Sequence, residues 1–295
     1  MLKKISLILI LLFSMVTFIP IALGCASQKE VNMPIVLLTD YGSEDYRISQ
    51  LNGIIYSNNP KARLIDASYS VPAFDIATGA FILDIAAKEF PENVVFISIV
   101  APYTQPETKY LVLTTNKNQI FVLPDNGLLT YVARNTGIKT IYQITKQELF
   151  DKPIKELVAE RVQGKIGALI ASGYRPQDVG IPVTTFQTLD IQEPSITDHR
   201  LMSTIIYIDR YGNAITNISE KTANEFGLKL GDLVNVEIPQ GTISAKFGII
   251  YSDVPKGETI VLVSNSLGVV QLSINLGNFA STYGVKAGTK IEIDK

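Results

Sequence analysis

The chain has 295 residues, with 26 Lys and Arg, 28 Asp and Glu, one histidine, one cysteine and no tryptophan, and its formal net charge is −2. This slightly acidic balance argues against a nucleic-acid partner, which normally requires a basic surface. The single histidine, His199, rules out a metal cluster built from several histidines, and the lone Cys25 rules out an internal disulfide. We therefore expect no metal site and a fold stabilised by an ordinary hydrophobic core.

The N-terminus has the layout of a secretory signal. Lys3 and Lys4 precede an apolar run over residues 5–23, and Gly24 stands before the only cysteine, Cys25. We expect residues 1–25 to act as a lipoprotein signal with a lipid on Cys25, and residues 26–33 to form a polar tether. The protein would then be exported and anchored to the membrane by its lipid. An uncleaved N-terminal anchor or ordinary cleavage near Ala26 are the alternatives.

Residues 34–185 are predicted to form an α/β domain with a mostly parallel sheet. Strand-like apolar runs alternate with segments of helical spacing, which is the pattern of repeated β-α-β units. We expect strands at 34–40, 63–66, 94–100, 111–115 and 119–122, and helices at 46–57, 75–89, from 128 and at 153–172.

Residues 196–295 are predicted to form a small all-β domain, either a barrel or a sandwich. Thr, Pro and polar residues without a sustained period fill 183–200 and mark the boundary, where His199 is expected at the surface. Short strand candidates separated by Gly, Asn and Pro turns follow. They lie at 201–208, 233–238, 244–251, 259–263, 269–274 and 290–293.

Aspartates lie at or near the predicted strand ends of the α/β domain. Asp40 and Asp66 each close a strand, and Asp45 comes shortly after the first of them. Open α/β sheets bind ligands at the carboxyl ends of their strands, so these acids would meet in one crevice. There they could hold ribose hydroxyls or a cationic group. Each aspartate taken alone is more simply a turn or helix-cap residue.

Two further polar segments are candidate binding elements. Residues 124–127, Pro-Asp-Asn-Gly, have the composition of a tight turn. Residues 209–213, Asp-Arg-Tyr-Gly-Asn, followed by Thr216 and Asn217, bring many hydrogen-bonding side chains beside an aromatic ring. This second segment suits base and ribose recognition, and it equally suits a polar hairpin.

The order and spacing of these motifs resemble the S-adenosylmethionine hydroxide adenosyltransferase and 5′-halogenase family, from Pro34 to the C-terminus. The motifs are short, but their agreement in order makes chance improbable. They are Asp40-Tyr41-Gly42 with Asp45, Ile65-Asp66-Ala67, Pro124 to Leu129, Ile208 to Asn213 with Thr216-Asn217-Ile218, and Asn265-Ser266-Leu267-Gly268.

This resemblance implies a trimer in which an adenosyl ligand lies between the N-terminal domain of one subunit and the C-terminal domain of its neighbour. It assigns ribose contacts to Asp40, the methionine ammonium to Asp45 and the methionine carboxylate to Ser266. Asp209 and Asn213 would hold the amino-acid or ribose side, and Asn126 joins the ligand-binding set. The implied reaction is an in-line displacement at the 5′ carbon, helped by alignment of the nucleophile. The resemblance implies S-adenosylmethionine as the substrate and implies no cofactor.

The catalytic positions of the family are mostly changed. The histidine of the hydrolytic members falls on Val158, and the arginine falls near Ala73 or Phe74. Only Asp66 matches the hydrolytic triad. Loss of a general base costs roughly 100 to 10,000-fold in rate.

Other positions near the expected reaction centre also differ. Tyr69 replaces a histidine that usually follows the matched aspartate. The halogenase threonine falls near Thr104, which we pair with Asp66 as a candidate catalytic residue, while the adjoining tyrosine is Ala101. We expect Glu160 and Arg161 to form an exposed ion pair at a helix start, and the alternative is that they are displaced remnants of the stretch that holds the family's histidine.

Three hypotheses follow from these matches and changes. The first is an enzyme that cleaves S-adenosylmethionine with water or an anion. The second is a catalytically inactive lipoprotein that binds a nucleoside or S-adenosylmethionine. The third is a surface scaffold without a ligand, which the retained ligand-binding residues argue against.

Overall fold

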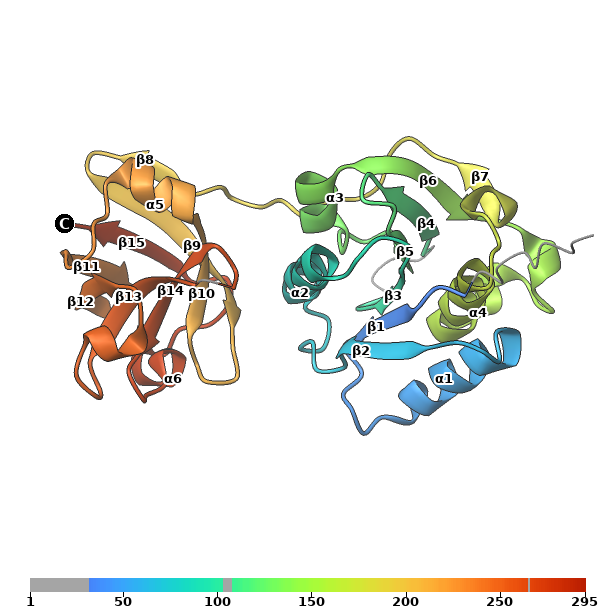
Figure 1. Ribbon diagram of the computed structural model, residues 1–295, viewed down its shortest axis with the longest axis horizontal. Helices are drawn as coiled ribbons and strands as arrows, with labels where there is room; N and C mark the ends of the chain where they lie inside the picture. Colours follow the sequence, from blue (N-terminus) through green and yellow to red (C-terminus); the bar gives the residue numbers. More distant parts are fainter. Residues whose placement is uncertain (1–31, 103–107, 265) are drawn as a thin grey trace, which may run out of the picture. The chain divides into compact units, whose positions relative to one another are not determined.

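The computed structural model describes residues 32–102, 108–264 and 266–295. These residues form two domains, an α/β domain followed by an all-β domain (Figure 1). In the first domain, short apolar strands form a seven-stranded mixed sheet of order β2-β1-β3-β5-β4-β6-β7. Its parallel part contains β1 (Ile35–Thr39), β2 (Leu64–Ser68), β3 (Val95–Ile99) and β5 (Ile120–Pro124). Its antiparallel part adds β4 (Tyr110–Thr115), β6 (Ile138–Ile144) and β7 (Gly180–Pro182).

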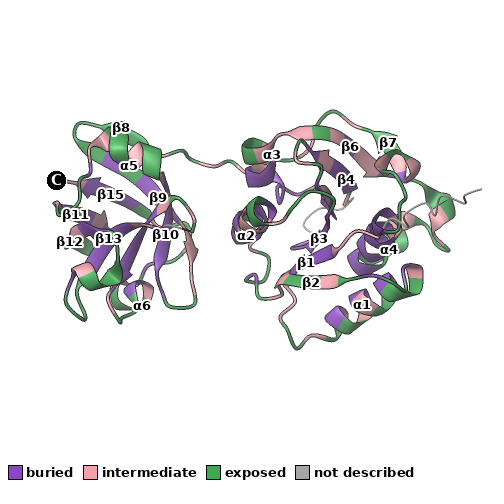
Figure 2. Cartoon of the chain, viewed as in Figure 1, coloured by how far each residue is buried: buried purple, intermediate pink, exposed green. Residues whose placement is uncertain are grey.

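Helices cover both faces of this sheet, which explains the uninterrupted apolar runs of its central strands. Along β1, Val36 and Leu38 pack with α2 (Ile76–Glu89) and α3 (Thr130–Thr136). The alternate residues Ile35 and Leu37 pack with α1 (Tyr46–Asn58) and α4 (Ala159–Ala171). Figure 2 shows the resulting buried strands β1 and β3 beside the more exposed edge strand β2.

The second domain is a seven-stranded β-barrel. Its strands follow the order β10-β14-β13-β12-β11-β15-β9, and pairing of β10 with β9 closes the sheet. Closure leaves no unpaired edge within the ring, while β8 (Ser195–Thr197) pairs with β9 outside it. The barrel strands are β9 (Arg200–Ile208), β10 (Ala214–Ser219), β11 (Leu233–Ile238), β12 (Gly241–Gly248), β13 (Thr259–Ser264), β14 (Val269–Ile274) and β15 (Lys290–Asp294).

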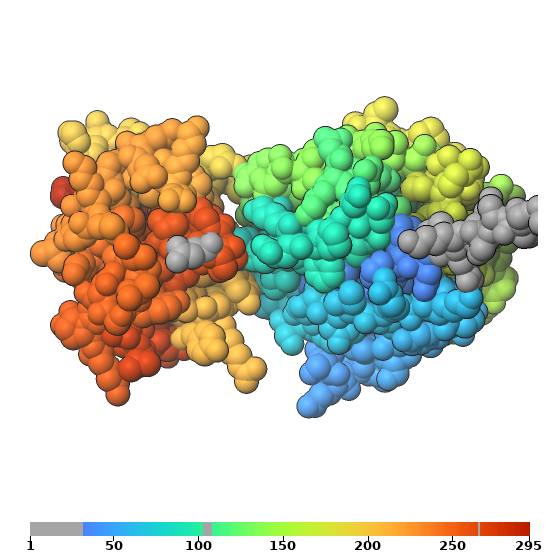
Figure 3. Space-filling model, viewed as in Figure 1, coloured from blue at the N-terminus to red at the C-terminus, as the bar shows by residue number. Residues whose placement is uncertain are grey.

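Apolar side chains fill the barrel, so the space between its ribbons in Figure 1 is occupied in the space-filling view of Figure 3. Val236, Val261, Leu272 and Ile293 are fully buried there. Two short helices, α5 (Glu220–Phe226) and α6 (Phe279–Tyr283), contribute Ala223 and Phe279 to the same core. The expected α/β plus all-β fold class is confirmed, and the barrel alternative is the correct one.

Several element boundaries differ from the sequence expectations. The helix expected over 153–172 starts at Ala159, because Leu157 and Val158 are extended and only a 3-10 turn, Ile154–Glu156, precedes them. Three other 3-10 turns lie at Gln147–Leu149, Pro176–Asp178 and Tyr251–Asp253. His199 is exposed in the turn between β8 and β9, as expected of a surface residue.

Two sets of sequence predictions lie outside the described residues. Cys25 and the signal segment are one set, and Thr104 is the other. Within residues 32–102, 108–264 and 266–295, no helix is long and apolar enough to span a bilayer.

Candidate functional site

Asp40 connects two loops at the carboxyl edge of the α/β sheet. Its Oδ2 accepts hydrogen bonds from the backbone nitrogens of Phe74 (3.0 Å) and Ala101 (3.1 Å). Both donors have positive φ angles, 66° and 43°, which L-residues rarely adopt. Asp40 therefore helps to hold two strained loop positions, and its replacement by alanine would remove this connection.

Asp66 lies in edge strand β2 and is paired with Tyr69. The strand continues to Ser68, so Asp66 lies two residues before its end instead of closing it as expected. The Tyr69 hydroxyl donates to Oδ1 of Asp66. Burial, and then the neighbouring Asp66, raise the pKa of Tyr69 above its ordinary value. Tyr69 therefore stays protonated at neutral pH and orients an exposed carboxylate.

Asn126 is a buried anchor for the loop that follows β3. Its Nδ2 donates to the carbonyl oxygens of Val100 (2.9 Å) and Ala101 (3.2 Å), and its Oδ1 accepts from Leu128 N (3.3 Å). The tight turn at 124–127 thus holds Ala101 in place, and the Ala101 nitrogen donates to Asp40. Asn126 acts on the site through this loop, since both of its amide hydrogens already have acceptors.

Asp45 is the N-cap of α1 and forms an ion pair with Arg47. Its Oδ1 accepts from the Arg47 backbone nitrogen (2.9 Å) and Nε (2.8 Å), while Oδ2 accepts from Nη2 (2.8 Å). The Arg47 hydrogen bonds lower the pKa of Asp45 to about 2. This carboxylate therefore remains charged and is fully engaged by Arg47.

Glu160 is a buried carboxylate in the first turn of α4. Met33 N donates to Ala171 O (2.9 Å), which puts the end of α4 at the start of β1 and its beginning at the sheet's carboxyl edge. Only 3% of Glu160 is exposed, and its Oε2 has no hydrogen-bond partner. The expected exposed ion pair is therefore wrong. Arg161 points elsewhere, into a surface hollow with Phe150.

The barrel contributes a second polar cluster in the turn before β10. Asp209 Oδ1 accepts from the nitrogens of Tyr211 and Asn213, both at 2.9 Å. Its Oδ2 accepts from Asn213 Nδ2 at 2.7 Å, and the same nitrogen lies 3.4 Å from the Tyr251 hydroxyl. Asp209 and Asn213 thus form the polar hairpin that the sequence left open, with Tyr251 beside it.

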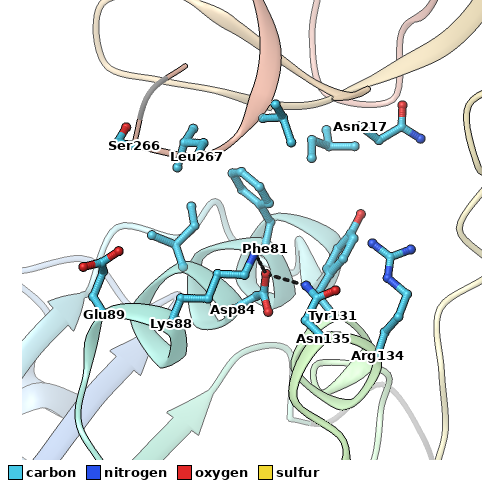
Figure 4. Close-up of a pocket in the computed structure, with 13 residues that line it drawn as sticks. Phe81, Asp84, Lys88, Glu89, Tyr131, Arg134, Asn135, Asn217, Ser266 and Leu267 are labelled. Atoms are coloured by element: carbon cyan, nitrogen blue, oxygen red, sulfur yellow. Dashed lines mark hydrogen bonds and ion pairs between the residues drawn. The ribbon is translucent and has the colours of Figure 1, made fainter. Parts of the chain in front are cut away.

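Ser266 lines a different, small cavity of about 80 Å³ (Figure 4). Phe81 of α2 contacts the Tyr207 ring of β9 near it, at a centroid distance of 5.7 Å. Asp84 accepts from Asn135 and pairs with Lys88 in this cavity. Ser266 and Leu267 face this group from the turn between β13 and β14.

The predicted site residues thus form two sets within one chain. Asp40, Asp45, Asp66 and Asn126 belong to loops and strands of the α/β domain, whereas the second set belongs to the barrel. Among the described residues, no hydrogen bond joins the two sets. The second set is Asp209, Asn213 and Ser266.

Sequence reasoning missed three residues at the carboxyl edge. Arg47 follows the helix-capping Asp45 by two positions, and this spacing is a local signal that predicts the Asp45–Arg47 ion pair. Phe74 is 77% exposed beside Asp40, but no sequence pattern marked its positive φ. Glu160 was assigned to the surface because charged residues are seldom buried without a partner.

Acids and a tyrosine lie at the carboxyl edge of a doubly covered α/β sheet, and a polar cluster lies on a closed barrel. This is the layout of a two-domain protein with a candidate site for a small polar ligand. Family models described as the SAM hydroxide adenosyltransferase N-terminal and C-terminal domains match residues 35–180 and 203–292. The chain belongs to this family of S-adenosylmethionine hydrolases and fluorinases, which cleave their substrate at its 5′ carbon.

Relatives match along most of the chain. An (R)-S-adenosyl-L-methionine hydrolase of Methanocaldococcus jannaschii is 30% identical over 282 residues, which is 92% of this chain and 99% of that protein. A fluorinase of Nocardia brasiliensis is 22% identical and covers 88% of this chain and 96% of its own length. The crystal structure of an uncharacterized conserved protein from Thermotoga maritima superposes with a TM-score of 0.83 at 28% identity, covering 88% of this chain and 100% of its own.

Proposed function

We propose that this protein cleaves S-adenosylmethionine, or an adenosyl sulfonium compound of the same type, at the 5′ carbon. Water or an anion is the nucleophile, and the products are adenosine or a 5′-substituted adenosine and a neutral thioether. The observation that carries the proposal is the Asp40 carboxylate, fixed by Phe74 and Ala101 at the sheet edge of a chain in this family.

The chemistry needs alignment more than proton transfer. The nucleophile forms a bond to the 5′ carbon while the carbon–sulfur bond breaks. The electron pair of the broken carbon–sulfur bond stays on sulfur, which becomes a neutral thioether. The leaving group is neutral, so it needs no acid. When water attacks, its proton passes to a carboxylate, and Asp66 is suited because the Tyr69 hydroxyl orients it. Asp40 would accept the ribose hydroxyls.

A second copy of the chain would complete the site. The α/β set and the barrel set are not joined by hydrogen bonds within one described chain, and each has groups that suit part of an adenosyl ligand. We infer a homotrimer in which the Asp209 and Asn213 hairpin of one subunit meets the Asp40 edge of the next. Light scattering of the purified protein tests this, and a monomer at micromolar concentration would contradict it.

A binding protein without catalysis is the second candidate. The histidine position of the hydrolytic members is occupied by Val158, an extended N-cap residue with no side-chain group for proton transfer. Export as a lipoprotein, proposed from Lys3, Lys4 and Cys25, would also separate the protein from cytosolic S-adenosylmethionine. Incorporation of a labelled fatty acid that disappears in Cys25→Ser would support the lipid anchor.

Product analysis by mass spectrometry separates the two candidates. The purified protein is incubated with S-adenosylmethionine with and without chloride, beside Asp66→Asn and Asp40→Asn variants. Methionine with adenosine or chlorinated adenosine, lost in both variants, is the expected result. Unreacted substrate with measurable adenosine binding would favour the binding protein. If neither a cleavage product nor adenosine binding is detected, the proposed adenosyl site is wrong.

A further inference from the structure

Glu160 is a buried acid whose carboxylate lacks a neutralising partner. Only 3% of the residue is exposed, its Oε2 accepts no hydrogen bond, and no ion pair of a described residue includes it. The adjoining cation, Arg161, lines a surface hollow with Phe150. An unpaired buried charge opposes folding, and such local conflicts are concentrated at functional sites. This conflict indicates a functional role for Glu160.

Gln163, one turn further along α4, shows how deep Glu160 lies. The nitrogen of the Gln163 amide donates to the carbonyl oxygens of Ser98 (2.9 Å) and Val122 (3.2 Å), where the pairing of β3 with β5 ends. Residues three apart lie on the same side of a helix, so Glu160 also faces the sheet. At a rise of about 1.5 Å per residue, Glu160 lies about 4.5 Å nearer to the carboxyl edge than Gln163.

This height is that of the loop that holds Asp40. A strand rises about 3.3 Å per residue, so the level of Glu160 is one to two residues beyond Ser98, close to Val100. The next residue, Ala101, donates its backbone nitrogen to Asp40 at 3.1 Å. Glu160 therefore lies beneath the part of the sheet edge that carries Asp40.

The Asp66 segment also borders the start of α4. Tyr69, whose hydroxyl donates to Asp66, packs against the hydrophobic cluster to which Leu157 and Ala159 belong. Both of these residues are within three positions of Glu160. The two carboxylates proposed for ribose binding and proton transfer thus share one edge of the sheet with Glu160.

The electrostatics of the α4 start depend on Glu160. The N-terminal end of a helix carries a partial positive charge and readily binds anions. Helix α4 has 13 residues, and its N-cap, Val158, makes no side-chain hydrogen bond. Glu160 puts a full negative charge into the first turn of this helix. An anion that enters from the carboxyl edge therefore meets a carboxylate and not a positive helix end.

We propose that Glu160 selects water, and not an anion, as the nucleophile of the 5′ cleavage. This inference rests on the proposed function. When water attacks the 5′ carbon, its oxygen gains positive charge until its proton leaves, and a buried carboxylate nearby stabilises that charge. A halide must enter the same region against the repulsion of Glu160. Glu160 is thus a specificity-determining residue, and Asp66 remains the acceptor of the water proton.

Product analysis by mass spectrometry tests the selection. S-adenosylmethionine is incubated with wild type, Glu160→Gln, Glu160→Asp and Glu156→Gln, in chloride and in chloride-free buffer of equal ionic strength. Glutamine keeps the size of the Glu160 side chain and removes its charge, whereas aspartate keeps the charge. Glu156 is the matched control, because it is exposed in the 3-10 turn before α4. Thermal unfolding verifies that each variant is folded.

We expect wild type to make adenosine as its main product even in chloride. Glu160→Gln should raise the ratio of chlorinated adenosine to adenosine at least about tenfold. A charge about 10 Å from an anion, at an effective dielectric constant of about 20, changes the binding of that anion by this factor. Glu160→Asp and Glu156→Gln should keep the wild-type ratio.

Three results would overturn the inference and leave the proposed cleavage intact. They are chlorinated adenosine as the main wild-type product, an unchanged product ratio in Glu160→Gln, and loss of both products in that variant. Absence of any nucleoside product from wild type in both buffers would overturn the inference and the proposed cleavage together.

Discussion

Replacing Asn126 by aspartate should weaken the fold and the site together. In wild type, Asn126 Nδ2 donates to the carbonyl oxygens of Val100 and Ala101 at 2.9 and 3.2 Å. Aspartate puts an oxygen without hydrogens in place of this nitrogen, so both hydrogen bonds are lost. Loss of two hydrogen bonds costs about 2 kcal/mol, and the buried oxygens left without donors add about 1 to 3 kcal/mol. We expect the free energy of unfolding to fall by about 3 to 5 kcal/mol, or the melting temperature by roughly 10 °C.

Urea and thermal unfolding at pH 8 and pH 5 measure this effect. The introduced carboxyl group can donate one hydrogen bond when it is protonated, so the loss should be smaller at pH 5 than at pH 8. Asn224→Asp, on the exposed side of α5, is the control and should change stability little. Adenosine affinity should fall as well, because Ala101 N positions Asp40. Equal stability of Asn126→Asp and Asn224→Asp would refute the role of Asn126 as an anchor.

Four other substitutions have expected outcomes. Glu160→Gln should raise the free energy of unfolding in urea by about 1 kcal/mol, since it removes a buried charge whose Oε2 has no partner; a lower value would show that the charge is compensated. Because the pKa of Asp45 is depressed, its pairing with Arg47 stabilises the fold fully above pH 3.8, and this stabilisation is lost as the pH falls towards 2. The free energy of unfolding of Asp45→Asn should therefore differ most from that of wild type above pH 4, and the two values should converge near pH 2. An unchanged difference at pH 2 would contradict this. Gly167→Ala places a methyl 2.3 Å from Ile97 Cδ1 and should cost about 1 to 3 kcal/mol, whereas Gly53→Ala in α1 meets open space and should gain about 0.5 to 1 kcal/mol. Denaturation of both variants checks the pair, and equal shifts would contradict the packing explanation.

The alternation of strands and helices could be predicted because burial on both sheet faces requires continuous apolar strands in the sequence. Helix α2 begins within one residue of the expected start, since Asp75 caps it through the Thr78 nitrogen. Helix α4 was predicted six residues too early. Its N-cap, Val158, offers no side-chain hydrogen bond, so no local signal marks where the helix begins.

The site could be predicted as a set of acids but not as a set of contacts. Asp40 was expected at a strand end, yet its partners Phe74 and Ala101 are 34 and 61 residues away in sequence. Asn126 looked like a turn residue because turns commonly contain Asn before Gly. Its hydrogen bonds to the loop after β3 depend on strand order, which a single sequence does not contain. The roles assigned to Asp209, Asn213 and Ser266 stay predictions.

The position of Asp66 in an edge strand also has a consequence for strand addition between molecules. Strand β2 is an edge of that sheet, with a free row of backbone hydrogen-bonding groups and an exposed Ile65 beside Asp66. A charge in the middle of an edge strand discourages addition of a strand from another molecule. Attempts to redesign the reaction by placing a valine or phenylalanine at position 66 would therefore create an aggregation-prone edge, and glutamate, which keeps the charge, is the safer exchange.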